Sequence, residues 1–393
     1  MVNFKTIISA LLALVAAAPF PSNTNFSIQQ VAVRVPPVHP AAIYARDYIR
    51  YGVKVPDHVA LAARSGWIDS VVTTPFQHDV VYLTPIQVGG SSLQVYFDTA
   101  SANLWVYTPQ TPAVGSHATY NTQSGRLIPN YYWNSVNVEG VISRGRVFVD
   151  KVRVGNHLMY PLQAVQVVDD IEPVSAMYEP LRAYDGIFGL AFSKGNTVLP
   201  IKQKTFFDNI KEWLNEPLFA VYVKHGAPGG YDFGWTDPRK YKGDIVWEPV
   251  YADEGLWKIS VNGYSIGDQS FSSTPFFAII DTGTTLLLLQ EDLVAEYYQK
   301  IPGSYNCEEA GGYIFPCSSI IPEFKLKIGQ HIAVVPGEFM IYTATNSTHC
   351  FGGIQTSPQT GRNYLGNVFL KSQYVIFYDH PQRRPWIGIA AQA

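Results

Sequence analysis

The 393-residue sequence has few charged residues, few cysteines and no hydrophobic run long enough to span a membrane. Charged side chains make up 15% of the chain, and there are three cysteines. The nine histidines show no metal-ligand spacing, and neither a glycine-rich phosphate loop nor a basic patch is present. These absences argue against a metalloprotease, a nucleotide-binding protein and a nucleic-acid-binding protein. We therefore expect no metal and no other cofactor.

The first 18 residues have the pattern of a signal peptide. Lys5 supplies the positive charge, residues 7–15 are apolar, and three alanines at 16–18 resemble a cleavage site. The abundance of Tyr, Ser, Thr and Gly is typical of a β-rich exported protein. We expect a soluble protein that is secreted to the extracellular space, with no membrane partner.

Two similar segments place an aspartate in a tight turn after a buried strand. The first is VYFDTAS at residues 95–101, and the second is FFAIIDTGTT at residues 276–285. Each is followed by further apolar residues, which predicts a strand, a turn and another strand. Because this strand–aspartate–turn motif occurs twice, the sequence suggests a duplicated fold in which Asp98 and Asp281 lie together in one site.

Paired carboxylates of this kind have a specific chemistry. Two carboxylates a few ångströms apart cannot both ionise cheaply, so they share a proton. The ionised member accepts a proton from a water molecule, while the protonated member polarises the carbonyl group of a bound peptide. Asp98 and Asp281 are therefore the predicted catalytic residues of a hydrolase.

At this point the sequence resembles the pepsin-like aspartic proteases, most closely the secreted fungal branch of penicillopepsin- and aspergillopepsin-type enzymes. Besides the two motifs, family-like segments are found at residues 205–209, 217–221, 231–235, 350–354 and 368–374. The resemblance implies an all-β, bilobal fold: two duplicated β-barrel-like lobes with a few short helices and a cleft between them. It also implies a monomer that binds an extended protein or peptide substrate.

The resemblance divides the chain into four parts. These are a signal peptide (1–18), a propeptide (19–70), an N-terminal lobe with Asp98 and the flap (71–241) and a C-terminal lobe with Asp281 (242–393). Residues 20–70 carry a net charge of +2 and residues 71–393 carry −6, which fits an inhibitory propeptide released by acid. Arg50-Tyr51 resembles the Lys-Tyr pair with which related propeptides reach the catalytic carboxylates.

Supporting roles follow from the same resemblance. Ser101 and Thr284 are expected to hydrogen-bond the outer carboxylate oxygens, Thr99 and Thr282 to tie the two loops together, and Gly283 to complete the second loop. Cys317 and Cys350 are the expected disulfide, which leaves Cys307 as a buried or partly buried thiol in preference to an intermolecular link. Asn346 begins a glycosylation sequon.

The sequence departs from the family pattern at two places. Ala100 replaces the usual glycine of the first motif, which is tolerated at negative φ and strained at positive φ. In the flap, which includes Glu139 and Gly140, Asn137 stands where the family has a tyrosine, although the partner of that tyrosine, Trp105, is kept. As a hypothesis, Glu139 accepts Lys or Arg beside the bond that is cut.

Two functions are therefore open. One is a zymogen of an acid endopeptidase; the other is a homologue that kept the fold but lost or changed its chemistry, acting as a binding protein or non-proteolytic enzyme. A serine hydrolase is disfavoured, because the G-x-S-x-G match at 263–267 is followed by a turn and a strand rather than a helix. Tyr96, Phe188 and Ile279 are candidate walls of substrate pockets.

A few elements can be placed in advance. Helices are expected at residues 40–51, 204–214 and 291–301. A strand at 79–89 should end in a hairpin turn at Gly89-Gly90. Residues 184–190 and 364–369 are expected to form equivalent strands that support the two aspartate loops.

Overall fold

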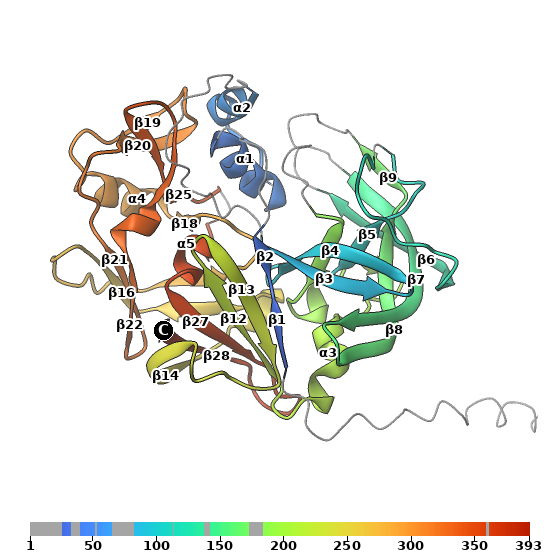
Figure 1. Ribbon diagram of the computed structural model, residues 1–393. Helices are drawn as coiled ribbons and strands as arrows, with labels where there is room; N and C mark the ends of the chain where they lie inside the picture. The colour runs from blue at the N-terminus through green and yellow to red at the C-terminus, as the bar shows by residue number, and fades with distance from the viewer. Residues whose placement is uncertain are drawn as a thin grey trace, which may run out of the picture.

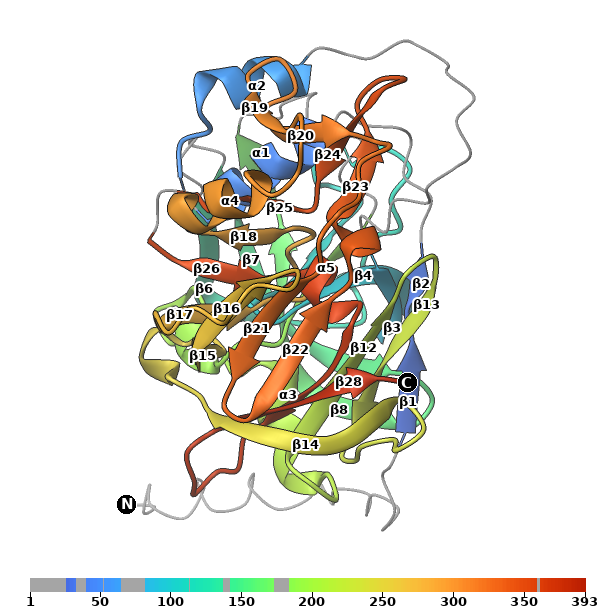
Figure 2. The same ribbon diagram turned by 90° about the vertical axis from the view of Figure 1, so that its left-hand side faces the viewer.

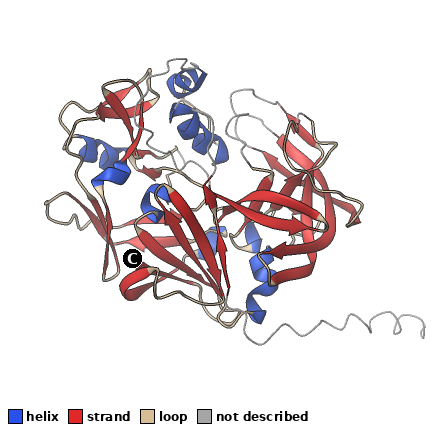
Figure 3. Ribbon diagram, viewed as in Figure 1, coloured by secondary structure: helices blue, strands red, loops and turns tan. Residues whose placement is uncertain are grey.

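The computed structural model describes residues 26–32, 40–51, 53–64, 82–112, 114–136, 142–172, 184–358 and 361–393. Within these ranges strands dominate and helices are short, as Figure 3 shows. The predicted signal peptide, the expected junction near residue 71 and the flap residues Asn137, Glu139 and Gly140 lie outside the described residues. The predicted all-β, bilobal fold is confirmed.

The N-terminal lobe is built on a ten-stranded sheet. A pairing of β7 with β3 curls this sheet toward a barrel, and β9 pairs with β7. The turn at Gly89-Gly90 joins β3 to β4 as expected. In spatial order the strands are β11 (Val198–Leu199), β6 (Arg126–Val136), β7 (Ile142–Val154), β8 (Leu158–Val168), β5 (Leu104–Tyr107), β10 (Gly186–Gly189), β4 (Ser91–Asp98), β3 (Tyr82–Val88) and β2 (Val31–Ala32), with β9 at Asp170–Glu172.

The C-terminal lobe contains three smaller sheets. The five-stranded sheet carries the second aspartate loop: β15 (Lys258–Val261), β17 (Phe276–Ile280), β26 (Asn363–Leu365), β18 (Leu287–Leu289) and β25 (Ile354–Thr356). The other two sheets are β16 (Gly263–Ile266), β21 (Phe324–Ile328) and β22 (His331–Val335), and β19 (Tyr305–Cys307), β20 (Gly312–Pro316), β24 (His349–Gly352) and β23 (Ile341–Ala344).

A six-stranded sheet combines segments from both ends of the chain (Figures 1 and 2). Its edge strand β1 precedes both lobes in sequence, and β14 begins at the residue where the predicted lobe boundary falls. The strand order is β1 (Phe26–Gln29), β13 (Ala227–Phe233), β12 (Leu218–Lys224), β27 (Gln373–Tyr378), β28 (Trp386–Gln392) and β14 (Tyr241–Pro249).

The two lobes repeat the same five-strand arrangement around their aspartates. In the first lobe the order is β8-β5-β10-β4-β3, and in the second it is β25-β18-β26-β17-β15. In both, the aspartate-bearing strand pairs in parallel with the supporting strand, β4 with β10 and β17 with β26. The predicted equivalence of residues 184–190 and 364–369 is therefore confirmed.

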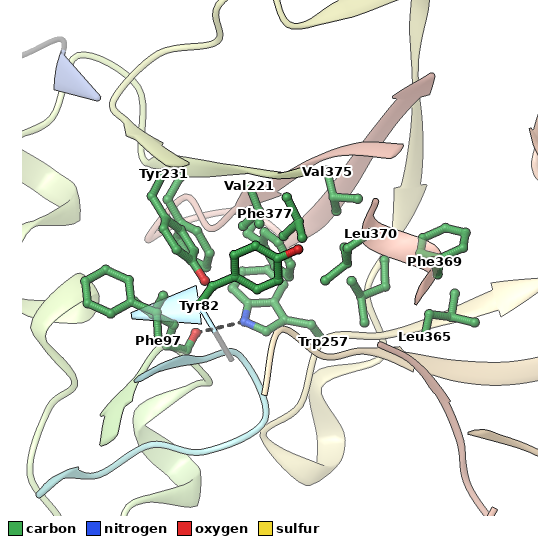
Figure 4. Close-up of a cluster of buried hydrophobic side chains, with 14 of the residues drawn as sticks. Tyr82, Phe97, Val221, Tyr231, Trp257, Leu365, Phe369, Leu370, Val375 and Phe377 are labelled. Atoms are coloured by element: carbon green, nitrogen blue, oxygen red, sulfur yellow. Dashed lines mark hydrogen bonds between the residues drawn. The ribbon is translucent and has the colours of Figure 1, made fainter. Parts of the chain in front are cut away.

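One hydrophobic core joins the lobes beneath the aspartate loops. Trp257 of the second lobe is buried and donates its Nε1–H to the carbonyl oxygen of Leu190 of the first, at 2.9 Å. Figure 4 shows Trp257 among side chains such as Phe97 of the ten-stranded sheet and Tyr231 and Phe377 of the six-stranded sheet. Because this core lies behind the loops, it fixes the position of one aspartate relative to the other.

The helices of the described residues are α1 (Pro40–Arg50), α2 (Asp57–Arg64), α3 (Phe206–Ile210), α4 (Glu291–Tyr298) and α5 (Asn367–Leu370). Of the three that the sequence predicts, α3 and α4 are clearly shorter than expected. The helix expected at 204–214 starts after the N-cap Thr205, whose Oγ1 accepts from Asp208 N at 3.2 Å, and gives way to a 3₁₀ turn at Lys211–Trp213. The helix expected at 40–51 is confirmed as α1, which ends at Arg50, and in Figure 1 it lies with α2 between the two lobes.

The G-x-S-x-G segment has no catalytic geometry. Its serine, Ser265, lies in the middle of β16 and is 2% exposed, with its Oγ donating to Gln269 O at 2.7 Å. The strand ends in a turn at Gly267, which has a φ of +56°, and no helix follows before β17. The motif is therefore mostly strand rather than the expected turn between strands, because only Gly267 lies in the turn, and the helix that a serine hydrolase needs after it is missing.

Candidate active site

The two aspartates lie at equivalent strand ends. Asp98 is the last residue of β4 and Asp281 directly follows β17; they are 2% and 0% exposed. Behind each loop the backbone of the supporting strand comes very close, and a Cβ at Gly189 or Gly366 would overlap main-chain oxygen atoms. Glycine at these two positions therefore allows both loops to rest directly on the supporting strands.

The two loops are tied together by a reciprocal set of threonine contacts. Thr99 N donates to Thr282 Oγ1 and Thr282 N donates to Thr99 Oγ1, both at 3.0 Å. Each hydroxyl then donates across the lobes, Thr99 to Ile280 O at 2.9 Å and Thr282 to Phe97 O at 2.8 Å. All four groups are buried, so these bonds fix the mutual position of the carboxylates.

Main-chain N–H groups bond the carboxylates in the same way in both loops. Ala100 N donates to Asp98 Oδ1 and Gly283 N donates to Asp281 Oδ1, each at 2.8 Å. The backbone of Ala100 lies outside the left-handed region, so its Cβ causes no backbone strain. The departure of the first motif from glycine therefore leaves the hydrogen bond to Asp98 intact.

The neighbouring hydroxyls differ between the loops. Thr284 Oγ1 donates to Asp281 Oδ2 at 2.5 Å. Ser101 Oγ is buried without a hydrogen bond of normal geometry, although it is close enough to lower the pKa of Asp98. The second loop thus has the hydroxyl contact that the family resemblance implies, and the first loop does not form it in this arrangement.

The end of α1 contacts both carboxylates. Arg50 Nη2 donates to Asp98 Oδ1 and to Asp281 Oδ1, the latter at 2.8 Å, so one nitrogen atom bridges the pair. Tyr51 Oη donates to Asp281 Oδ2 at 2.5 Å and contacts Thr284 Oγ1. The Tyr51 ring stacks on Tyr364, with ring centroids 3.6 Å apart. Arg50 and Tyr51 therefore cover the aspartate pair.

Burial dominates the electrostatics of this pair. Burial raises the pKa of Asp98, and the negative charge of Asp281 acts in the same direction, whereas Arg50 and the Ala100 N–H act against it. Burial alone would lower the pKa of Arg50, but the two carboxylates raise it well above its ordinary value. Arg50 is therefore a fixed positive charge whose counter-charges can be removed by acid.

The rest of α1 packs on residues from both lobes. Tyr44, Tyr48 and other apolar residues of α1 and α2 form one buried cluster with body residues that include Tyr96, Ile279 and Phe351. In Figure 2, α1 and α2 lie beside strands β19, β20 and β24. Of the candidate pocket walls, Tyr96 and Ile279 lie in this cluster, whereas Phe188 is fully buried in the inner core.

The other predicted residues lie away from the aspartates. Half-buried Trp105 packs its ring near Trp133 and Tyr184, with centroids 6.3 and 6.1 Å away. The predicted Cys317–Cys350 disulfide is present, with a Cα–Cα distance of 5.0 Å, and Cys307 is a buried free thiol as expected. Asn346 is exposed in a turn, which is compatible with glycosylation. The modification itself stays a prediction.

Sequence reasoning missed two charged residues of the site. Arg46 Nη2 donates to Thr285 Oγ1 at 2.6 Å, and Asp47 is fully buried beside it, 3.6 Å from Arg46 Nη2. The spacing of Arg46 and Arg50, four residues apart on a predicted helix, indicates that both lie on one face. Nothing in the sequence indicates that Asp47 would be buried.

The fold and the aspartate pair define an aspartic protease, and the comparisons agree. The eukaryotic aspartyl protease family model matches residues 81–392, so the chain belongs to this family and is an aspartic-type endopeptidase. It is 47% identical over 397 residues to penicillopepsin-1 of Talaromyces stipitatus and 43% identical over 400 residues to aspergillopepsin-1 of Aspergillus oryzae. Both alignments cover 100% of each chain. The predicted resemblance is confirmed.

Proposed function

We propose that this protein is a secreted zymogen whose residues 19–70 form an inhibitory propeptide, and that the Asp98/Asp281 pair hydrolyses peptide bonds at acid pH once the propeptide is removed. The observation that carries the proposal is the contact of one Arg50 nitrogen with both carboxylates. This nitrogen occupies the position between the two Oδ1 atoms where an attacking water would be held, so substrate hydrolysis and Arg50 binding exclude each other.

The catalytic step follows from the shared proton of the pair. Once Arg50 has left, the ionised carboxylate takes a proton from the water molecule while the water oxygen attacks the peptide carbonyl carbon. The protonated carboxylate donates to the carbonyl oxygen, which gives a tetrahedral diol without a covalent enzyme intermediate. Collapse of the diol breaks the C–N bond as a proton passes to the leaving amine. The threonine contacts supply positioning, since they hold the two carboxylates at a fixed separation.

Acid release has a direct physical cause in this arrangement. Burial raises the pKa of Asp98, but the charge of the docked Arg50 lowers it, so docking of Arg50 and protonation of Asp98 oppose each other. A proton taken up by the pair removes part of the negative charge that binds Arg50 and leaves this buried cation poorly compensated, which is unfavourable. Docking of the propeptide is therefore weakened as the pair takes up the shared proton that hydrolysis needs.

Secretion and glycosylation at Asn346 are part of the same proposal. The N-terminal 18 residues have the signal-peptide pattern, and none of the helices in the described part of the chain is long and apolar enough to cross a membrane. Culture medium and cell extract from an expressing host would be compared by mass spectrometry. Secreted protein that begins downstream of residue 18 is the expected result; protein retained in cells with an intact N-terminus would contradict it.

The test of the hydrolase compares the wild type with Asp98→Asn at about pH 3.5 on a denatured protein substrate, where a shared-proton pair is expected to work. Peptides and loss of the propeptide are followed by mass spectrometry. We expect cleavage by the wild type alone. In parallel, Arg50→Gln removes the bridging charge, so conversion of the zymogen to the mature enzyme should begin at a pH closer to neutral. A wild type that stays folded but cuts nothing would overturn the proposal.

Apart from the Ser101 hydroxyl, which forms no hydrogen bond to Asp98, no observation at the described site favours a changed or lost chemistry. The one departure that the structure describes, Ala100, keeps its N–H on Asp98 and has no backbone strain. Both carboxylates, their main-chain donors and the threonine contacts are in place.

A further inference from the structure

One nearly buried ammonium group joins α3 to the six-stranded sheet, at the end of the molecule away from α1 (Figures 1 and 2). Lys211, in the 3₁₀ turn that follows α3, donates from Nζ to Asp208 Oδ1 at 2.7 Å and to Asp379 Oδ2 at 2.5 Å. The side chains of these three residues are only 11–14% exposed. Asp208, Lys211 and Asp379 are called the Lys211 cluster below.

The Lys211 cluster connects two different sheets. Asn209 of α3 donates from Nδ2 to Oε1 of Gln163 in β8 at 2.8 Å, which holds the helix to the ten-stranded sheet. Asp379 directly follows β27 of the six-stranded sheet, and its N–H donates to Pro217 O at 2.9 Å. A change of charge within the cluster therefore acts on the contact between the two sheets.

The Lys211 cluster contains two carboxylates for one ammonium group. Both carboxylates contact the same nitrogen atom, so their contacting oxygens lie within about 5 Å of each other. When both are ionised, one nearly buried negative charge is left uncompensated. Two carboxylates so close together favour a state in which one of them is protonated. That state has one cation and one anion, so the charges balance.

The hydrogen bonds indicate that Asp379 takes up this proton. Asp208 Oδ2 also accepts from Ser193, whose N–H lies 3.1 Å away and whose hydroxyl also donates, and these donors stabilise the ionised form of Asp208. Among the described residues, the Asp379 carboxylate accepts from Lys211 alone. Burial raises the pKa of Asp379 and the charge of Asp208 acts in the same direction, whereas Lys211 and His380 oppose this rise.

We propose that the Lys211 cluster is a pH-sensitive joint, which holds α3 against the six-stranded sheet in acid and loosens as the pH rises toward neutrality. In acid the neutral Asp379 carboxyl group still accepts from Lys211 and no longer repels Asp208. Ionisation of Asp379 at higher pH restores the uncompensated charge, so the stabilising contribution of the joint is lost as the pH rises. The inference goes beyond the proposed function and does not depend on it.

The experiment measures hydrogen exchange in peptides that cover α3 and the following 3₁₀ turn, because exchange reports local opening. Every protein carries Asp98→Asn, which prevents self-cleavage in acid. Asp379→Asn is compared with this parent, since asparagine keeps the shape of the carboxyl group without its charge. At equal pH, the parent exchange rate is divided by the variant rate. We expect this ratio to be about threefold or more higher at pH 7.5 than at pH 4, because the variant lacks the repulsion that appears on ionisation.

A second variant tests the same charges in the opposite direction. Lys211→Met leaves the two carboxylates without their cation, so its exchange should exceed that of the parent by a factor that grows between pH 4 and pH 7.5. The matched control, Asp244→Asn, removes an exposed carboxylate from β14 of the same sheet and should show no such trend. A ratio for Asp379→Asn that is the same at both pH values would indicate an ion pair with a structural role alone and would overturn the inference. So would a factor for Lys211→Met that does not change with pH, which keeps the test decisive if Asp379→Asn does not fold.

Discussion

Asp47 gives a testable prediction, because its ionised carboxylate destabilises the docking of α1 on the aspartate pair. It is fully buried in the face of α1 that covers the aspartate pair, and neither of its oxygens has a hydrogen bond. Burial raises the pKa of Asp47 to about 6, and the charge of Asp281 also raises it, while Arg46 and Arg50 act in the opposite direction. An acid whose pKa is raised on docking favours the docked state only when it is protonated.

The size of the effect on docking follows from the shift in the pKa of Asp47. The rise from the ordinary value of 3.8 to about 6 corresponds to about 3 kcal/mol of docking free energy. The contribution of Asp47 to docking is therefore lost as the pH rises from about 4 to 6, and the ionised group opposes docking at neutral pH. Asp47→Asn removes the charge at every pH, so α1 should be held more tightly than in the wild type by up to about 3 kcal/mol at pH 8.

Hydrogen exchange of the backbone amides of α1 measures this directly, since it reports local opening. At equal pH, α1 in Asp47→Asn should exchange about 100-fold more slowly than in the wild type at pH 8, and about tenfold more slowly at pH 5. The control is Asp57→Asn in α2, whose side chain is 93% exposed and should have no such effect. Equal protection at pH 8, or a difference that does not shrink with acid, would refute the reasoning.

Three further changes test other parts of the structure. Gly283→Ala adds a methyl that would overlap the guanidinium of Arg50, while the backbone tolerates it; we expect a folded protein that converts at higher pH, and unchanged conversion would contradict this. Thr282→Val leaves Thr99 N and Phe97 O without partners, so stability in urea should fall by roughly 2–5 kcal/mol, and a loss below 1 kcal/mol would contradict the role of the threonine contacts. Cys317→Ser opens a loop with a sequence separation of 33 residues and should lower the free energy of unfolding by roughly 3–4 kcal/mol. The variant and the wild type should be equally stable if the disulfide of the wild type is first reduced.

The fold could be predicted from the sequence because its signals are local and repeated. A buried strand, an aspartate and a small-residue turn recur with the same flanking pattern, and a duplicated pattern predicts a duplicated arrangement. The supporting strands at 184–190 and 364–369 were predicted for the same reason, since each has glycine within an apolar run. Helix lengths were overestimated because the apolar pattern continues beyond the residues that keep helical hydrogen bonds.

The candidate site was predictable only in part, because some of its properties depend on distant neighbours. Whether Ala100 is strained depends on its φ, which the sequence leaves open and the structure places outside the left-handed region. The burial of Asp47 is likewise invisible in sequence, since helical residues next to an arginine are usually solvated.

The charges under α1 act on its docking in opposite directions as the pH falls. Protonation of the catalytic pair reduces the negative charge that binds Arg50 and weakens docking, whereas protonation of Asp47 removes a desolvated charge and strengthens docking. Because the pKa of Asp47 is about 6, this carboxyl group becomes neutral as the pH falls just below that value, and docking should be tightest there. Release then requires the loss of the counter-charges of Arg50 to outweigh this gain. A propeptide built in this way is expected to stay docked in mild acid and to leave only when the catalytic pair itself is protonated.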